Sequence, residues 1–190
     1  MRKEIRVVGF DDAPHHRGDA SVPVVGVVMR GGAYMEAVLR TDVTGDGDDA
    51  TERIAETVKT ARAAPNLTCI LLQNLMVAGF NTIDLDVLHA ATGLPVVAVA
   101  RGVPDLPAVE RALLGGAVPG GEAKWGRIAR VRGRMVVLRD GAVTMTPVGL
   151  GAADAADVLG RTTVRGHMPE PLRLAHLIGA GWVLGQSKGQ

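Results

Sequence analysis

Two consecutive acids, Asp11 and Asp12, follow directly after the strand-like run of residues 5–10. Carboxylate oxygens are the ligands that Mg²⁺ and Mn²⁺ prefer, so acids at the end of a strand can seat a divalent cation. Such cations hydrolyse phosphodiesters when several carboxylates surround them. We therefore expect Asp11 to be a metal ligand and a catalytic residue, and Asp12 to face away. The alternative for Asp11 is a strand-end acid in a polar turn.

Further acids lie in the turn-rich segment of residues 45–49, between an expected strand and an expected helix. The fold could bring one of Asp46, Asp48 and Asp49 beside Asp11. We take Asp46 and Asp49 as candidate metal ligands. Asp49 also fits a capping box that opens a helix, because Glu52 stands three residues later, and this is its commoner role.

A basic stretch runs from Lys124 to Arg139, with one lysine, five arginines and no acid. Such a stretch could hold the phosphate backbone of a nucleic acid. It could equally be an edge hairpin that its charge keeps soluble. The candidate nucleic-acid-binding residues are Lys124, Arg127, Arg130 and Arg132.

Two pairs of residues offer nitrogen donors. His15 and His16 follow the acids closely enough to add ligands to a cation, although adjacent histidines are more often solvated loop residues. Arg173 and His176 are three residues apart, so on a helix they share a face. They could present themselves to a phosphate or an acid, or could pin the helix to the domain.

The composition bounds the class of protein. A chain of 190 residues with 47% hydrophobic content fits one domain, residues 1–190. The formal net charge of +1 neither requires nor excludes a polyanionic partner. Cys69 is the only cysteine, and its apolar surroundings indicate a core residue. With no apolar leader and no apolar stretch near the roughly 20 residues that span a bilayer, we expect a soluble, cytoplasmic protein without membrane contact.

The elements that must position these residues follow from the apolar pattern. Three strands, near residues 5–10, 22–30 and 33–43, form an antiparallel meander. Helices and apolar strands then alternate, as in a parallel sheet covered on both faces. The helices are expected near residues 49–65, 84–92 and 106–114, and the strands near 68–72 and 95–100. A hairpin around Asp140-Gly141 and helices near 152–161 and 171–184 complete the chain. This order is typical of an RNase H-like sheet with its first strand in a central position.

Several motifs together resemble the DUF99 family over nearly the whole chain. They are Gly9-Phe10-Asp11-Asp12-Ala13-Pro14, Val22-Pro23-Val24-Val25-Gly26, Asp46-Gly47-Asp48-Asp49-Ala50-Thr51, Ala78-Gly79-Phe80-Asn81 and Pro169-Glu170-Pro171-Leu172-Arg173-Leu174-Ala175-His176. That family is similar to endonuclease V, an RNase H-like nuclease that cuts phosphodiesters with Mg²⁺ or Mn²⁺. The resemblance implies an α/β fold whose mixed sheet has three antiparallel strands followed by parallel ones, flanked by helices, with an extra β-hairpin near residues 124–148.

The resemblance also implies roles for individual residues. Asp11 takes the position of the first metal-binding aspartate, and Arg101 the position of a lysine near the metal centre, where it would stabilise the phosphate. Mg²⁺ or Mn²⁺ is the implied cofactor, and DNA or RNA the implied partner. One departure stands out: the strand that usually ends in Asp-Gly ends here in Gln73-Asn74.

Two functions therefore stay open, and the sequence does not set the oligomeric state. The first is a divalent-metal-dependent nuclease that hydrolyses phosphodiesters. The second is a nuclease-like module that has lost catalysis and binds nucleic acid or protein. Gln73-Asn74 favours the second, since neutral amides bind a divalent cation more weakly than a carboxylate does.

Overall fold

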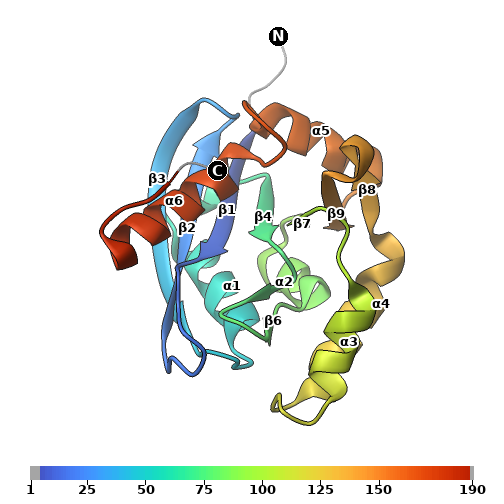
Figure 1. Cartoon of the computed structure of the whole chain (residues 1–190). Coiled ribbons are helices and arrows are strands. Elements are labelled where there is room, and N and C mark those ends of the chain that lie inside the picture. Colours follow the sequence, from blue (N-terminus) through green and yellow to red (C-terminus); the bar gives the residue numbers. More distant parts are fainter. Residues whose placement is uncertain (1–4, 189–190) are drawn as a thin grey trace.

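A computed structural model describes residues 5–188, which form a seven-stranded sheet with helices on both faces (Figure 1). The strand order is β3-β2-β1-β4-β7-β9-β8. The strands are β1 (Arg6–Asp12), β2 (Val22–Arg30), β3 (Tyr34–Val43), β4 (Cys69–Gln73), β7 (Val96–Arg101), β8 (Val136–Leu138) and β9 (Val143–Val148). Two short strands, β5 (Met76–Val77) and β6 (Asn81–Thr82), pair apart from this sheet.

The direction of the strands decides where their ends meet. Strands β1, β4 and β7 are parallel neighbours, so their carboxyl ends share one edge of the sheet. Strands β2 and β3 continue antiparallel from β1, and β9 and β8 continue antiparallel from β7. The predicted mixed sheet is therefore confirmed, with an antiparallel hairpin added at the far side.

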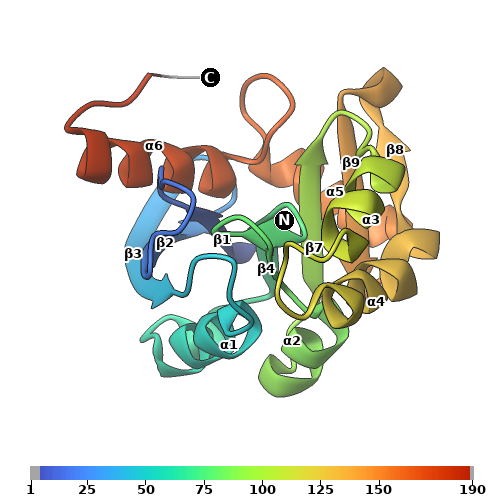
Figure 2. The same ribbon diagram turned by 60° about the horizontal axis from the view of Figure 1, so that its bottom comes forward.

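Two layers of helices cover the sheet, as Figure 2 shows. Helices α1 (Ala50–Thr60) and α2 (Leu85–Thr92) lie on one face, and α5 (Ala152–Thr162) and α6 (Glu170–Leu184) on the other. Helices α3 (Leu106–Leu114) and α4 (Gly121–Val131) pack on each other and on the segment that follows β4. Within residues 5–188, no helix is long and apolar enough to cross a membrane.

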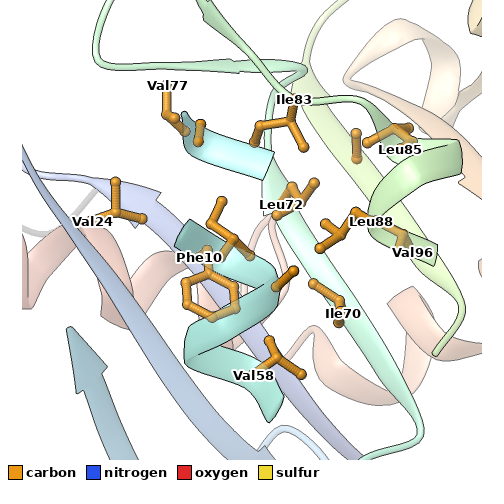
Figure 3. Packing of buried hydrophobic residues seen from close by; sticks show 14 of the residues in the cluster. Phe10, Val24, Val58, Ile70, Leu72, Val77, Ile83, Leu85, Leu88 and Val96 are labelled. Atoms are coloured by element: carbon orange, nitrogen blue, oxygen red, sulfur yellow. The ribbon is translucent and has the colours of Figure 1, made fainter. Parts of the chain in front are cut away.

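Side chains alternate across β1 and β4 and so divide the core. Phe10 and Leu72 point toward α1 and α2 and join the buried cluster drawn in Figure 3. Val7 and Leu71 point the other way, toward α5 and α6. Cys69 is buried on that second face, and burial raises the pKa of its thiol to about 12. The expected role of Cys69 as a core residue is confirmed.

Two glycines allow close approach to β1. A Cβ atom at Gly26 would lie 2.5 Å from the ring of Phe10, and one at Gly9 would lie 2.8 Å from the Cβ atom of Pro171. Any larger residue at Gly9 would push the first turn of α6 off the sheet. The glycine thus fixes how closely α6 covers the carboxyl end of β1.

The structure corrects the expectation for the basic stretch. Residues 121–131 form helix α4, and only β8 and β9 form the hairpin. The reason is that Ile128 and Val131 recur at helical spacing and are buried, which a strand of this sequence would not achieve. The hairpin turn is also longer than the expected Asp-Gly pair, because Leu138 pairs with Val143 and leaves residues 139–142 in the turn.

Candidate active site

A cleft of about 400 Å³ lies where the carboxyl ends of β1, β4 and β7 meet α6. Its polar lining consists of Asp11, Asp12 and His15 from β1 and its loop, Gln73 and Asn74 from the end of β4, Arg101 from β7, and Arg173 and His176 from α6. His176 of α6 is 165 residues along the chain from Asp11, so the fold alone brings these groups together.

Asp11, Gln73 and Arg101 share one face of the sheet. Side chains alternate along a strand, so Asp11 points to the same face as Val7, Gln73 to the same face as Leu71, and Arg101 to the same face as Val99. Val7, Leu71 and Val99 all belong to the core beneath α5 and α6. The register supports this, since Phe10 pairs with Leu72 and Gln73 with Val99. Gln73 is therefore the neighbour of Asp11 on the adjacent strand.

Asp11 is the most deeply buried acid of the cleft, with 4% of its surface exposed. Its Oδ2 lies 3.1 Å from Nδ1 of His176, and its Oδ1 accepts a hydrogen bond of 3.0 Å from the backbone N–H of Asp12. Burial, followed by the charge of Asp12, raises the pKa of Asp11 to about 8, and Arg101 opposes the shift. A buried carboxyl of this kind has less compensating positive charge than it needs to ionise.

Asp12 does not face away as expected. It lines the same cleft, and its Oδ2 accepts a hydrogen bond of 2.9 Å from the backbone N–H of Ala78. Nδ1 of His15 lies 3.3 Å from that oxygen. The reason is that the pairing of β1 with β4 ends at Phe10 and Leu72, while Asp11 and Asp12 still pair with β2, so the side of β1 that faces β4 is open to the cleft at both acids. His15 is thereby also brought to the acids.

The two other candidate metal ligands lie elsewhere. Asp46 accepts a hydrogen bond of 2.8 Å from the N–H of Phe80, and Asp49 accepts one of 2.7 Å from Nδ2 of Asn81 and another of 3.0 Å from the N–H of Thr44. Neither lines the cleft with Asp11. Asp49 precedes α1 but makes no side-chain cap bond, so the expected capping box with Glu52 is wrong. Both acids instead brace the loops around β6.

Across residues 5–188, no three His, Cys, Asp or Glu side chains stand together in an arrangement that could hold a metal ion. The charge at the cleft comes from the adjacent pair Asp11 and Asp12. The amide oxygens of Gln73 and Asn74 can add neutral ligands. A cation fits the pair by charge, with fewer carboxylates than a two-metal centre uses.

The candidate nucleic-acid-binding residues are largely engaged with protein. Lys124 is 2% exposed and donates a hydrogen bond of 2.7 Å to the backbone oxygen of Asp46. Arg127 pairs with Asp48, and Arg130 with Asp84. Arg132 is exposed and has no side-chain partner among the described residues. These contacts pin α4 to the loops before α1 and α2, so the stretch is not the free basic surface that its sequence suggests.

Helix α6 carries Arg173 and His176, the pair that the sequence predicts to share a helix face. Arg173 forms an ion pair of 2.6 Å with the buried Glu170, which raises the pKa of Arg173, while His176 reaches Asp11. His176 therefore meets an acid from another element, as one of the two expected roles requires, whereas the ion pair of Arg173 lies within α6. The signal in the sequence was the spacing of the two residues within the motif of residues 169–176.

A second, more apolar cavity of about 470 Å³ adjoins the cleft. It shares Asp12 and Asn74 with the cleft and extends between β7, α3 and α4. Leu75, Met76, Leu106 and Val109 are among the apolar residues of its wall. An apolar hollow beside a polar cleft suits a flat ring with a charged neighbour.

The model of the family described as endonuclease dU matches residues 3–183. The chain belongs to this family. A UPF0215 protein of Methanothermobacter thermautotrophicus is 41% identical over 100% of this chain and 93% of its own length. A crystal structure of a protein of unknown function from Archaeoglobus fulgidus superposes with a TM-score of 0.82 at 31% identity, covering 93% of this chain and 96% of that one.

The endonuclease dU family shares its fold with endonuclease V. The structure of Ciona intestinalis endonuclease V, in complex with a 24mer DNA containing an inosine followed by a ribo-adenosine, superposes on this chain with a TM-score of 0.60. It is 16% identical and covers 92% of this chain and 84% of its own. The likeness at this identity shows the fold alone, and it confirms the RNase H-like architecture expected from the sequence.

Proposed function

We propose that this chain is a divalent-metal-dependent endonuclease that cuts DNA beside a deaminated base, with deoxyuridine as the lesion. The observation that carries the proposal is the buried Asp11, in contact with His176 in a cleft at the joined ends of three parallel strands. Membership of the endonuclease dU family and the endonuclease V fold support the reaction class. The lesion comes from the family's description.

The residues of the cleft fit distinct tasks. Asp11 would hold the cation, with Asp12 beside it and the amide of Gln73 as a neutral neighbour. When bound, a divalent cation activates water and neutralises charge on the phosphate. His176 can hold or pass a proton at Nδ1, which lies 3.1 Å from Asp11. Arg101 supplies positive charge where negative charge develops on the phosphate oxygens.

The apolar cavity suits the lesion. Enzymes that act at a single base take it out of the helical stack and hold it between apolar side chains. The cavity of about 470 Å³ opens onto the cleft through Asp12 and Asn74, so a base held there would leave its phosphate near Asp11. The amide of Asn74 could read the edge of that base by hydrogen bonds.

The test is cleavage of labelled duplexes that carry one deoxyuridine, one inosine or no lesion, with Mn²⁺ or Mg²⁺. We expect a nick only with the cation and in preference beside deoxyuridine. Asp11→Asn should abolish the nick and His176→Ala should slow it at least tenfold. Arg62→Ala serves as the matched control, because Arg62 is exposed and lies at the opposite end of the sheet. Equal activity of wild type and Asp11→Asn would refute the proposal.

A second function, a binding module without catalysis, is favoured by Gln73 alone, because the amide removes a carboxylate from the strand beside Asp11. Its expected outcome is tight binding of the deoxyuridine duplex with no nick under any cation. Restoration of the nick by Gln73→Asp would then show that this one side chain separates the two functions.

A further inference from the structure

A smaller hollow of about 240 Å³ lies next to the cleft, on the side away from β2. We call it the arginine pocket; its lining is Arg101, Ala142, Arg165, Gly166, His167, Met168 and Arg173. No acidic side chain lines it. Because Arg101 and Arg173 also line the cleft, the two hollows meet at these two guanidinium groups.

The charge of this pocket is largely unneutralised. Arg101 and Arg165 are exposed, and neither forms an ion pair with any residue of 5–188. Arg173 alone has a carboxylate partner, Glu170. The arginines of α4 differ, since Arg127 and Arg130 are held by acids. Three guanidinium groups thus lie together beside the cleft, and two of them have no carboxylate partner among residues 5–188.

The pocket wall is held in place before any ligand arrives. Nη1 of Arg139 donates hydrogen bonds to the backbone oxygens of His167 and Gly166, at 2.7 Å and 3.4 Å. Met168, the next residue, is buried in the core cluster under α5. A loop fixed at both its backbone and its neighbouring side chain loses little entropy when it binds a ligand.

We propose that the arginine pocket binds a phosphodiester of the substrate strand that neighbours the one held at Asp11. Guanidinium groups match phosphate oxygens with paired hydrogen bonds, and phosphate contacts set the register of a nucleic acid on a protein. Arg101 would touch both phosphates, because it lines both hollows. Arg165 and His167 are then positioning residues that decide which phosphodiester faces Asp11. The inference rests on a nucleic-acid substrate, as in the proposed function, but does not require cleavage.

The experiment measures binding in EDTA, so that no cleavage occurs. The probe is a set of fluorescein-labelled deoxyuridine duplexes in which one phosphate at a time, on either side of the lesion, is replaced by a neutral methylphosphonate. We expect one internal position to weaken wild-type binding about tenfold. Arg165→Ala should weaken binding of the unmodified duplex by the same factor and should be insensitive to the methylphosphonate at that position.

Arg62→Ala is the matched control and should bind every duplex as the wild type does, because Arg62 is an exposed arginine far from the cleft. Duplexes with and without a 5′-phosphate distinguish a backbone phosphate from a terminal one. The proposal is overturned if Arg165→Ala remains sensitive at every position, or if only the 5′-phosphate matters. Both results leave the proposed function standing, because that is decided by the nick with Mn²⁺.

Discussion

The buried carboxyl of Asp11 lowers the stability of the folded protein when it is ionised. Burying an acid without a full set of positive partners opposes its ionisation, and here this raises the pKa of Asp11 to about 8. Such perturbed groups concentrate at active sites, where stability is given up for reactivity. Asp11, the best candidate ligand for a cation, is thus a residue that destabilises the folded protein when no cation is bound.

The first prediction follows from this shift. The folded protein keeps a proton on Asp11 up to about pH 8, whereas the unfolded chain releases it near the ordinary aspartate pKa of 3.8. The contribution of Asp11 to stability is therefore present below pH 4 and is lost as the pH rises toward 8. Asp11→Asn lacks this loss, so in EDTA we expect it to be more stable than wild type by about 2 kcal/mol or more at pH 8.

Urea denaturation at pH 4.5 and pH 8 measures this difference. Asp140→Asn provides the comparison, since it removes an exposed carboxyl from a turn. We also expect millimolar Mn²⁺ to stabilise the wild type and not Asp11→Asn at pH 8, because only the native carboxylate binds the ion. A stability difference that is the same at both pH values would contradict the pKa of Asp11.

The second prediction concerns Gln73, the neighbour of Asp11 on β4. Gln73→Asp places a second carboxylate on the same face, so we expect at least tenfold tighter Mn²⁺ binding by calorimetry. In EDTA above pH 8, where Asp11 is ionised, the same change should lower stability, since two like charges then face each other. Gln73→Asn, which shortens the side chain without adding charge, should do neither. Equal Mn²⁺ affinity of the two variants would show that residue 73 does not reach the cation.

At the scale of elements, the site depends on how closely α6 covers β1. The third prediction is that Gly9→Ala lowers stability by about 1–3 kcal/mol, because its Cβ atom would clash with Pro171. It should also lower activity, since a displaced α6 moves His176 from Asp11. The nick beside deoxyuridine and thermal unfolding measure the two effects. Gly181→Ala is the control, because a Cβ atom there meets nothing within 4 Å. Normal activity of Gly9→Ala would mean that the spacing of α6 is uncritical.

The fourth prediction concerns helix α4. Lys124 is buried with its ammonium on the backbone oxygen of Asp46, and burial lowers the pKa of that ammonium. Lys124→Ala should lower stability by about 2–4 kcal/mol, whereas Lys124→Met should cost less because it fills the space. Neither change should alter DNA binding at a temperature where both variants are folded. Loss of DNA binding in the stable Lys124→Met protein would restore the nucleic-acid role that the sequence suggests.

The elements differ in how far the sequence reveals them. The strands β4 and β7 and the helices that alternate with them were predicted, since burial on both faces leaves an unbroken apolar run. Helix α4 was missed because its glycines and arginines hide a short apolar stripe. Its arginines looked like a surface for phosphate, and their acidic partners lie about 46–79 residues away along the chain. Asp11 could be predicted as a strand-end acid and His176 as a residue that could meet an acid, but the pairing of these two could not be predicted, because only the packing of α6 brings them together.

At the scale of the whole molecule, the cleft and the arginine pocket bring a small group of arginines together. Arg127 and Arg130 of α4 are paired to acids, whereas Arg101, Arg165 and Arg173 line the cleft and the arginine pocket, where a polyanion held at Asp11 would meet them. Binding of a nucleic acid should therefore be local and only moderately dependent on salt. This contrasts with a basic ribbon along residues 124–139, which would release more counterions.

The fifth prediction concerns how strongly DNA binding depends on salt concentration. Each phosphate neutralised on duplex DNA contributes about −0.9 to the slope of log K against log salt concentration, so three arginines give a slope of about −3. Fluorescence anisotropy in EDTA over a range of KCl concentrations measures it. Arg165→Ala should reduce the slope by about one, and Arg132→Ala should leave it unchanged. A slope of about −6 that falls with Arg132→Ala would mean that DNA runs along α4, and that the ion pairs of Arg127 and Arg130 open to receive it.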